Sequence, residues 1–320
     1  MTVAEDTHTE RPLITFAVFA YNQEQYIREA IEGAFAQTYE PLEIILSDDS
    51  SSDKTFEIIH EMTSRYTGRH KVVVNRNSEN LGLIGHVNKI FEIASAEIVV
   101  VAGGDDISLP HRTEEIATCF SNNPDAMAVH SDVQRLSAEG EDVGVWVPPV
   151  QERKMDLEDM AVSGAMHIGA SAAYRKALYK KFGPICERHA FEDLVLGFRA
   201  ALWGQLLYIE GPLVKYRTGV GISSVRKLRD RRSRIAQRVG DINRKVGVLR
   251  QRLWDYETCN PCVDNGEIGR KLNSNLLGWE MRLMYYKCPK RLLDYVLTAR
   301  LIYLLRVMKT ETGYMLGLFR

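Results

Sequence analysis

The feature that most constrains the fold is an alternation of apolar, strand-length runs with amphipathic helical segments between Leu13 and Ala102. Each strand and helix together take about thirty residues, the length of a βαβ crossover. The strand runs are almost continuously apolar, as in parallel strands covered on both faces. We therefore predict an α/β fold with a mainly parallel sheet and helices on both sides. The predicted strands are 13–20, 42–47, 71–75 and 97–102, and the predicted helices are 24–37, 56–62 and 83–94, with Asp53 as a helix cap.

The alternation loosens after residue 102. We predict a strand at 126–130, a loop-rich insertion over 137–165, helices at 173–182 and 192–203, and short strands at 206–209 and 213–216. From residue 223 the sequence predicts three helices, at 223–257, 264–287 and 290–308, with Pro261 and Pro289 between them. The chain is thus expected to have a disordered leader (1–11), an α/β domain (12–222) and a helical C-terminal region (223–320).

Charge is distributed unevenly between these regions. Residues 1–220 carry 20 Lys and Arg against 33 Asp and Glu, a net charge of −13, whereas residues 221–320 carry 21 against 9, a net charge of +12. This asymmetry predicts either different partners for the two regions or docking of one on the other.

The cysteines and the N-terminus indicate a reduced, cytoplasmic setting. The five cysteines are scattered, and the metal-like spacing of Cys259 and Cys262 has no second pair, so we expect ordinary thiols. No secretory signal precedes residue 12, and no uncharged apolar run reaches the roughly 18 residues of a membrane span.

Polar side chains follow three of the predicted strands at the point where each strand ends. In an open parallel sheet these ends meet at one edge, where ligands bind. Neighbouring carboxylates there repel each other unless a cation offsets them, and a hard divalent cation that also binds substrate phosphates fits this need. The residues are Tyr21 and Asn22 after the first strand, Asp48 and Asp49 after the second, and Asp105 and Asp106, preceded by two glycines, after the fourth.

Two common nucleotide-binding motifs are missing from the sequence. No G-x-G-x-x-G follows the first strand, and no G-x-x-x-x-G-K-[ST] occurs. A nicotinamide-binding Rossmann site and a P-loop are therefore excluded.

Several short motifs follow one another in a fixed order along residues 12–220. They are Ala20-Tyr-Asn22, Gln37-Thr-Tyr39, Asp48-Asp-Ser-Ser-Ser-Asp53, Asn80-Leu-Gly82, Asp105-Asp106, Ile168 to Arg175, Phe191-Glu-Asp-Leu194 and Tyr216-Arg217. The series resembles the signature of family 2 inverting glycosyltransferases. The resemblance implies the GT-A fold for residues 12–222. It also implies metal-dependent, inverting transfer of a sugar from a nucleotide-sugar donor, expected to be UDP-linked, to a hydroxyl of a glycan or lipid-linked acceptor in bacterial surface polysaccharide synthesis.

The resemblance also implies roles for individual residues. Asp49, with Asp48 as the second candidate, would accept the imide N–H of uracil or thymine, and Asp105 would approach the ribose. Asp106 would bind Mn²⁺ or Mg²⁺, and Asp193 would be the general base, with Glu192 as the alternative. The residues implied in donor binding are Phe19, Tyr21 (which would stack on the base), Asn22, Asp48, Asp49, Asp105 and Arg217.

Basic residues crowd the start of the C-terminal region. A basic amphipathic helix can lie on an anionic membrane, which would place the protein at the inner face of the cell membrane. Docking on the acidic α/β domain and a homodimer contact are the alternatives. Nucleic-acid binding is not predicted, because no recognition motif accompanies the basic run. The run comprises Arg226, Lys227, Arg229, Arg231, Arg232, Arg234 and Arg238.

Two other functions are alternatives to sugar transfer. A nucleotidyltransferase would have a Gly-rich loop with Lys or Arg after the first strand, where this chain has Tyr21-Asn22. An inactive scaffold that binds a sugar nucleotide or a glycan would not need Asp105, Asp106 and Asp193 together.

Overall fold

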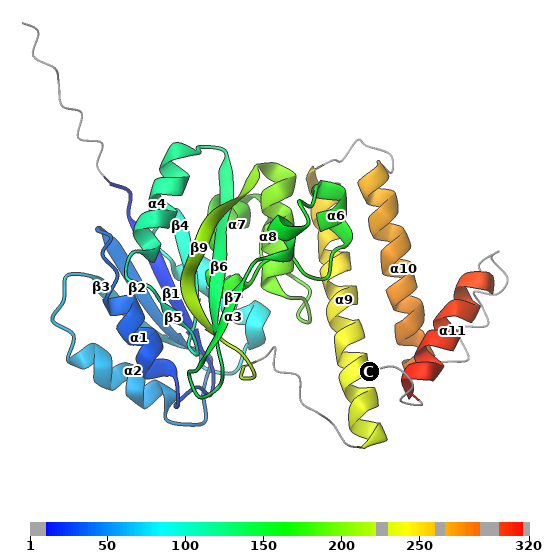
Figure 1. The fold of residues 1–320 in the computed structure, drawn as a ribbon, viewed down its shortest axis with the longest axis horizontal. Helices are drawn as coiled ribbons and strands as arrows, with labels where there is room; N and C mark the ends of the chain where they lie inside the picture. Colours follow the sequence, from blue (N-terminus) through cyan, green and yellow to red (C-terminus); the bar gives the residue numbers. More distant parts are fainter. Residues whose placement is uncertain (1–10, 222–229, 260–265, 289–300, 316–320) are drawn as a thin grey trace, which may run out of the picture.

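The computed structural model describes residues 11–221, 230–259, 266–288 and 301–315. A curled sheet flanked by helices forms one part of the molecule, and a row of helices lies beside it (Figure 1). The first part of the sheet confirms the predicted alternation. Its elements are β1 (Ile14–Ala20), α1 (Ile27–Phe35), β2 (Leu42–Asp48), α2 (Thr55–Ser64), β3 (Lys71–Arg76), α3 (Gly82–Ile93) and β4 (Ile98–Gly103).

The remaining elements of the sheet part are shorter and more varied. They are β5 (Ile107–Ser108), α4 (Arg112–Asn122), β6 (Ala126–Leu136), β7 (Asp142–Trp146), α5 (Pro149–Glu152), α6 (Leu157–Val162), a 3-10 turn (Gly169–Ser171), β8 (Ala173–Arg175), α7 (Ala177–Phe182), α8 (Glu192–Trp203) and β9 (Gln205–Arg217).

The described strands form one nine-stranded sheet. Their order is β3-β2-β1-β4-β8-β6-β9-β5, and β7 pairs with β6. Strands β1 to β4 are parallel, as predicted, and β6 is parallel to β9. Strand β8 is antiparallel to both β4 and β6 and therefore joins the two parallel parts.

Three predictions about the second part of the sheet were wrong in detail. The predicted helix at 173–182 begins as a strand, since Ala173–Arg175 fills the gap between β4 and β6. The two late strands are one strand, β9, which bends at Gly211 and Pro212, where its register with β6 shifts. The loop-rich insertion at 137–165 holds β7, α5 and α6.

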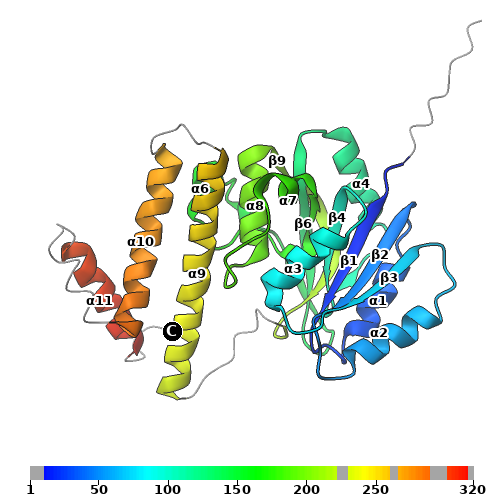
Figure 2. The same cartoon turned by 180° about the vertical axis from the view of Figure 1, so that it is seen from behind.

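Helices cover both faces of the sheet. On one face, β1 side chains such as Phe16 and Val18 pack with Ile31 of α1 and Phe120 of α4. On the other face, Ala17 belongs to a core with α3, α7 and α8 (Figure 2). The prediction that Asp53 caps α2 was wrong by one residue: the N-cap is Lys54, and Asp53, just before it, accepts the Thr55 N–H at Oδ1 at 2.9 Å.

Three helices follow the sheet part: α9 (Arg231–Cys259), α10 (Glu267–Lys287) and α11 (Leu301–Met315). Helix α9 packs on α8 through a fully buried ion pair in which Arg199 Nε lies 2.8 Å from Asp255 Oδ2. Within the described ranges, no helix is long and apolar enough to cross a membrane. Of the predicted third helix (290–308), residues 301–308 lie within the described part and belong to α11. Residues 1–10, Arg226, Lys227, Arg229, Cys262 and residues 290–300 lie outside the described residues.

Candidate functional site

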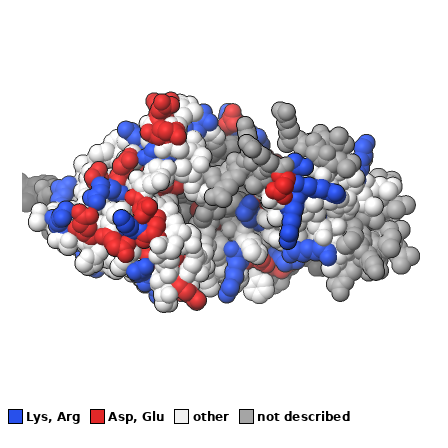
Figure 3. All heavy atoms as spheres, turned by 90° about the horizontal axis from the view of Figure 1, so that it is seen from below, with Lys and Arg blue, Asp and Glu red and all other residues white. Residues whose placement is uncertain are grey.

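The loops after β1, β2 and β4 start at the same level of the sheet. Phe19 pairs in register with Ser47 of β2 and with Gly103 of β4, and Ala20 pairs with Asp48. This alignment brings Tyr21, Asn22, Asp48, Asp49, Asp105 and Asp106 to one edge. Figure 3 views the molecule from below, with red and blue side chains mixed over the sheet part and mainly blue ones over the C-terminal helices.

Asn22 ties the first loop to the second. Its N–H donates to Ser51 Oγ at 2.9 Å, and its Oδ1 accepts the Ser52 N–H at 2.9 Å. Its φ of 51° lies in the left-handed region, which asparagine tolerates better than most residues. The neighbouring Tyr21 remains 45% exposed, whereas Phe19 packs edge-on against His86. The hydrogen bonds of Asn22 therefore fix the loop while the ring of Tyr21 stays accessible to a ligand at this edge.

Asp48 and Asp49 are both buried but have different partners. Asp48 Oδ2 lies 3.3 Å from Arg76 Nε and accepts the Ser51 N–H, while its Oδ1 has no hydrogen-bond partner among the described residues. Asp49 Oδ1 accepts from Asn77 Nδ2 at 2.8 Å and from the Leu81 N–H at 2.9 Å. These two donors fix the orientation of the Asp49 carboxylate. The Asn80-Leu-Gly82 motif takes part in this through the Leu81 N–H.

Asp105 and Asp106 form a crowded acidic pair at the end of β4. Asp106 Oδ1 accepts the Arg217 N–H at 2.8 Å. A Cβ added at Gly103 would lie 2.7 Å from Asp106 Oδ2, and one at Gly221 would lie 2.6 Å from Asp105 Oδ2. Burial, and next the charge of Asp105, raise the pKa of Asp106 well above its ordinary value. Gly103 and Gly221 therefore let the backbone come close to the two carboxylates, where a larger residue would meet them.

The acidic pair fits a divalent cation. Two oxygen-donor carboxylates that repel each other in a buried setting would be stabilised by a hard cation such as Mg²⁺ or Mn²⁺. No group of three or more His, Cys, Asp or Glu that could hold a metal occurs among the described residues. The pair would therefore hold such an ion only together with substrate oxygens or water, as Mg²⁺ sites commonly do.

Two arginines near the acidic pair, Arg217 and Arg112, have protein partners. Arg217 donates from Nε to the Asp105 carbonyl at 3.1 Å and from Nη2 to Glu29 Oε2 at 3.0 Å, and it is only 4% exposed. Arg112 is fully buried and donates to the Val101 carbonyl and to Ser108. The guanidinium of Arg112 therefore lies in the core, away from solvent. Arg217 holds the loop of the acidic pair in place.

Glu192 and Asp193 stand in the first turn of α8. Asp193 Oδ1 accepts the Leu194 N–H at 2.7 Å. A Cβ added at Gly169 would lie 2.2 Å from Glu192 Oε1, so the segment containing Gly169 can approach the pair only because that residue is glycine. Burial and the charge of Asp193 raise the pKa of Glu192 to about 8. Burial raises the pKa of Asp193 to about 6, against the opposing effects of the Leu194 and Gly169 N–H groups and Arg252. Two backbone N–H groups and Arg252 favour the carboxylate form of Asp193, so Asp193 is the member of the pair that loses its proton first as pH rises.

The raised pKa of Glu192 predicts a pH-dependent gain in stability for Glu192→Gln. Between the unfolded pKa near 4.5 and the folded pKa near 8, the folded state binds the extra proton, so wild-type stability falls as pH rises through this window. Glutamine has no proton to lose. We expect the thermal midpoint of the variant to exceed that of wild type by a few degrees at pH 8.5 and to match it at pH 4.5. An equal difference at both pH values would contradict the assignment.

One buried residue near this pair was not predicted from the sequence. Arg252 of α9 is fully buried and donates from Nε and Nη2 to the Leu194 carbonyl at 3.0 and 2.7 Å, and from Nη1 to the Ala161 and Ser163 carbonyls at 3.1 and 2.8 Å. Its charge lies close enough to Asp193 to favour the carboxylate. No local pattern marks this arginine among the many of the C-terminal region.

Sequence comparison places these features in a known context. The profile of "Glycosyl transferase family 2" matches residues 15–183. An uncharacterized glycosyltransferase of Haemophilus influenzae is 30% identical over 220 residues, which cover 64% of this chain and 65% of that protein. An uncharacterized glycosyltransferase of Nostoc sp. is 26% identical over 216 residues, 64% of each chain. The chain thus spans less than two thirds of the length of these relatives.

Solved structures show the same fold. S. aureus TarS 1–349 in complex with UDP-GlcNAc is 15% identical, with a TM-score of 0.59 over 94% of this chain and 81% of that one. The mannosyltransferase PcManGT from Pyrobaculum calidifontis, in complex with GDP-Man and Mn²⁺, is 16% identical, with a TM-score of 0.55 over 92% and 88% of the two chains. These neighbours are GT-A glycosyltransferases, so the predicted fold class is confirmed.

Proposed function

Since the chain belongs to glycosyltransferase family 2, we propose that it is an inverting enzyme that transfers a sugar from a nucleotide-sugar donor to a hydroxyl of a glycan or lipid-linked acceptor. The observation that carries this proposal is the convergence of an exposed aromatic ring, an oriented carboxylate and an acidic pair at one sheet edge. Tyr21 offers a face for a base, Asp49 an acceptor for an imide, and Asp105-Asp106 a site for a metal-bound diphosphate. The family match removes the nucleotidyltransferase alternative.

The donor is proposed to be UDP-linked. Asp49 is held by two donors at Oδ1, and among the described residues nothing donates to its Oδ2. A carboxylate oxygen in this position suits the imide N–H of uracil or thymine. The structural neighbours bind UDP-GlcNAc in one case and GDP-Man in the other, so guanine is the base that must be tested against uracil.

The chemistry needs one base and a stabilised leaving group. In an inverting displacement the acceptor hydroxyl attacks the anomeric carbon, its proton passes to a carboxylate, and the bond to the nucleoside diphosphate breaks. Asp193 is the proposed base because backbone N–H groups and Arg252 favour its carboxylate form, whereas burial and the charge of Asp193 favour protonated Glu192. Asp106 and Asp105 are the residues that would hold Mn²⁺ or Mg²⁺, which supplies positive charge to the departing diphosphate when bound. Arg217 keeps these two carboxylates in place.

The acceptor and the setting rest on the family resemblance. Surface polysaccharide synthesis is the proposed context, and contact with a membrane surface stays a prediction from the basic run. The C-terminal region reaches the sheet part through buried contacts, such as Arg199 with Asp255 and the Gln251 Oε1 that accepts the Cys186 N–H at 2.8 Å. The two parts are therefore in contact, but this ion pair does not use the uneven charge, because its cation, Arg199, lies in the acidic part and Asp255 in the basic part.

Calorimetric titration of the nucleotides tests the proposal. With Mn²⁺ present, we expect UDP and TDP to bind equally tightly, GDP to bind more weakly than UDP, and CMP to bind weakly. Without Mn²⁺, none of the diphosphates should bind tightly. Asp106→Asn should weaken UDP binding in Mn²⁺ by tenfold or more and leave the small metal-free affinity unchanged. Unchanged affinity of the variant in Mn²⁺ would refute the metal role. Failure of every nucleotide to bind wild type would refute the assignment of a nucleotide-sugar donor and would favour a scaffold that binds a glycan.

A further inference from the structure

A cavity of about 230 Å³ lies between the start of α8 and the C-terminal helices. Its walls come from Phe191 and Leu194 around the first turn of α8, from the segment after α6, from one face of α9, and from Trp279 of α10. Arg238, Asp241, Arg244 and Lys245 recur at helical spacing along that face of α9. Its volume is below the roughly 300–1,000 Å³ of pockets for drug-sized ligands, so it suits one small group rather than a whole oligosaccharide.

The cavity has an excess of positive charge. Three cations and one carboxylate line it. Arg238 donates to both carboxylate oxygens of Glu311, and Arg244 pairs with Asp241. Lys245 forms no ion pair within the described residues, and its ammonium lies 4.2 Å from the centre of the Trp279 ring. Lys245 is exposed to solvent, and the charges of Asp241 and Glu311 partly offset those of Arg238 and Arg282 around it. Its ammonium is therefore the lining cation that an anion from solvent can meet without breaking an ion pair.

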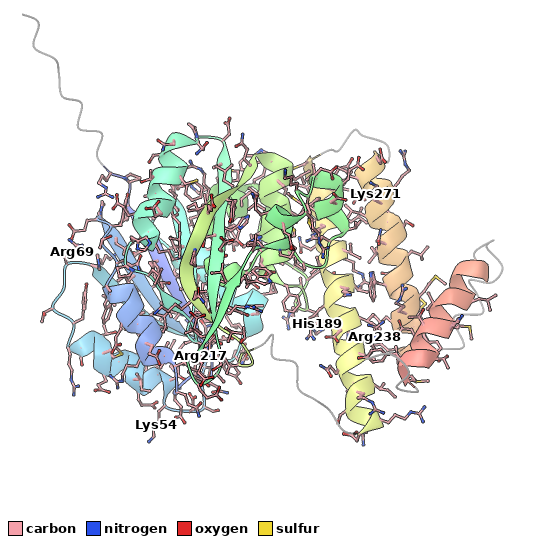
Figure 4. All side chains as sticks on the ribbon, viewed as in Figure 1. Lys54, Arg69, His189, Arg217, Arg238 and Lys271 are labelled. Atoms are coloured by element: carbon pink, nitrogen blue, oxygen red, sulfur yellow. The ribbon has the colours of Figure 1, made fainter. Side chains whose placement is uncertain are left out.

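The cavity adjoins the proposed catalytic pair. Phe191 and Leu194, which flank Glu192 and Asp193 in sequence, both line it. The loop that leads into α8 lies beside α9, since a Cβ added at Gly247 would lie 3.5 Å from the carbonyl carbon of His189. Figure 4 labels His189 in this loop and Arg238 on α9. Neither Glu192 nor Asp193 lines the cavity itself, so a group bound there would lie beside the turn that carries the proposed base.

The geometry points to an acceptor subsite for an anionic group, a phosphate or a carboxylate carried by the glycan, with Lys245 as its counterion. The inference rests on the proposed function, because it assigns the bound anion to the acceptor. The donor edge is acidic, so an anion in this cavity is separated from the donor site by charge as well as by position. Phe191 and the Trp279 ring supply the apolar walls against which the carbon skeleton of a sugar packs.

Direct binding of small anions tests the subsite. The probes are glycerol 3-phosphate and glucuronate, and their neutral counterparts are glycerol and glucose. Each is titrated into the full chain without divalent metal, because Asp105 and Asp106 then repel anions from the donor site. We expect one of the two anions to bind saturably and its neutral counterpart not to bind. The anion that binds distinguishes a phosphate-bearing from a carboxylate-bearing acceptor. Absence of binding by both anions would overturn the proposal.

Matched variants locate the site. Lys245→Met should weaken anion binding about tenfold, Lys245→Arg should retain it, and Lys271→Met should match wild type. Lys271 is a suitable control because it pairs with Glu158 near the far end of α10 from Arg238, and its loss changes net charge equally (Figure 4). Equal binding by Lys245→Met and wild type would overturn the proposal.

UDP binding with Mn²⁺, measured on the same samples, separates this inference from the proposed function. Intact UDP binding without anion binding would refute only the subsite. Anion binding that depends on Lys245 without UDP binding would refute only the assignment of a nucleotide-sugar donor.

Discussion

Asp193→Asn is expected to lower the rate of sugar transfer by about 10²–10⁴-fold, the contribution typical of a general base. The amide cannot accept the proton that the acceptor hydroxyl loses on attack. Donor binding should remain within about twofold of wild type, since the acidic pair and Asp49 belong to other elements. The measurement is transfer under single-turnover conditions alongside nucleotide titration. Substantial transfer by the variant would reject Asp193 as the base.

The pH profile gives an independent check of the same assignment. Burial raises the pKa of Asp193 to about 6, so the wild-type rate should rise with pH through this value as the carboxylate ionises. Glu192→Gln is the matched control, because it removes a neighbouring carboxyl that is already neutral at pH 7. It should keep most of the activity at pH 7 and leave the rising limb of the profile near its wild-type position, since Glu192 is uncharged in the range where Asp193 ionises. A variant as inactive as Asp193→Asn would instead make Glu192 the base.

The parallel half of the fold could be predicted because its signals are local. Each of β1 to β4 is an apolar run bounded by turn residues, and each crossover helix has its own apolar stripe. Strand β8 gave no such signal, since Ala173–Arg175 is too short to show a period and is a strand only because it pairs with β4 and β6. Strand β9 was split in two because Gly211 and Pro212 interrupt its apolar pattern without ending the strand.

The same distinction applies to the site. The position of Tyr21, Asp49 and Asp106 at one edge of the sheet could be predicted because each follows its own strand, whereas their roles stay predictions. The partners that hold the site could not, because they come from distant parts of the sequence. Glu29 of α1 meets Arg217 of β9, and both Leu194 and the end of α6 meet Arg252 of α9. The composition of the C-terminal region shows that it is basic, but composition does not distinguish a buried arginine from an exposed one.

Arg252→Met is expected to destabilise the protein by about 3–5 kcal/mol, the largest loss we predict for a single substitution. Methionine fills much of the same space but donates no hydrogen bond. The buried carbonyls of Leu194, Ala161 and Ser163 would all lose their Arg252 donor. Arg250→Met is the matched control, because Arg250 lies on the same helix, is exposed and pairs with Glu280. It should change the free energy of unfolding by about 1 kcal/mol or less. Urea denaturation measures both.

The substitution should also act on catalysis, because Arg252 lies beneath the turn that carries Asp193. Loss of its charge would raise the pKa of Asp193 further, so the rising limb of the pH profile should move to higher pH. Arg252→Lys separates the two effects. Lysine keeps the charge and loses the forked geometry, so this variant should be destabilised but should keep the wild-type pH profile. If Arg252→Lys and Arg252→Met shift the profile equally, the C-terminal helix supports the active site by packing alone. If only Arg252→Met shifts it, α9 supplies part of the electrostatic setting of the base.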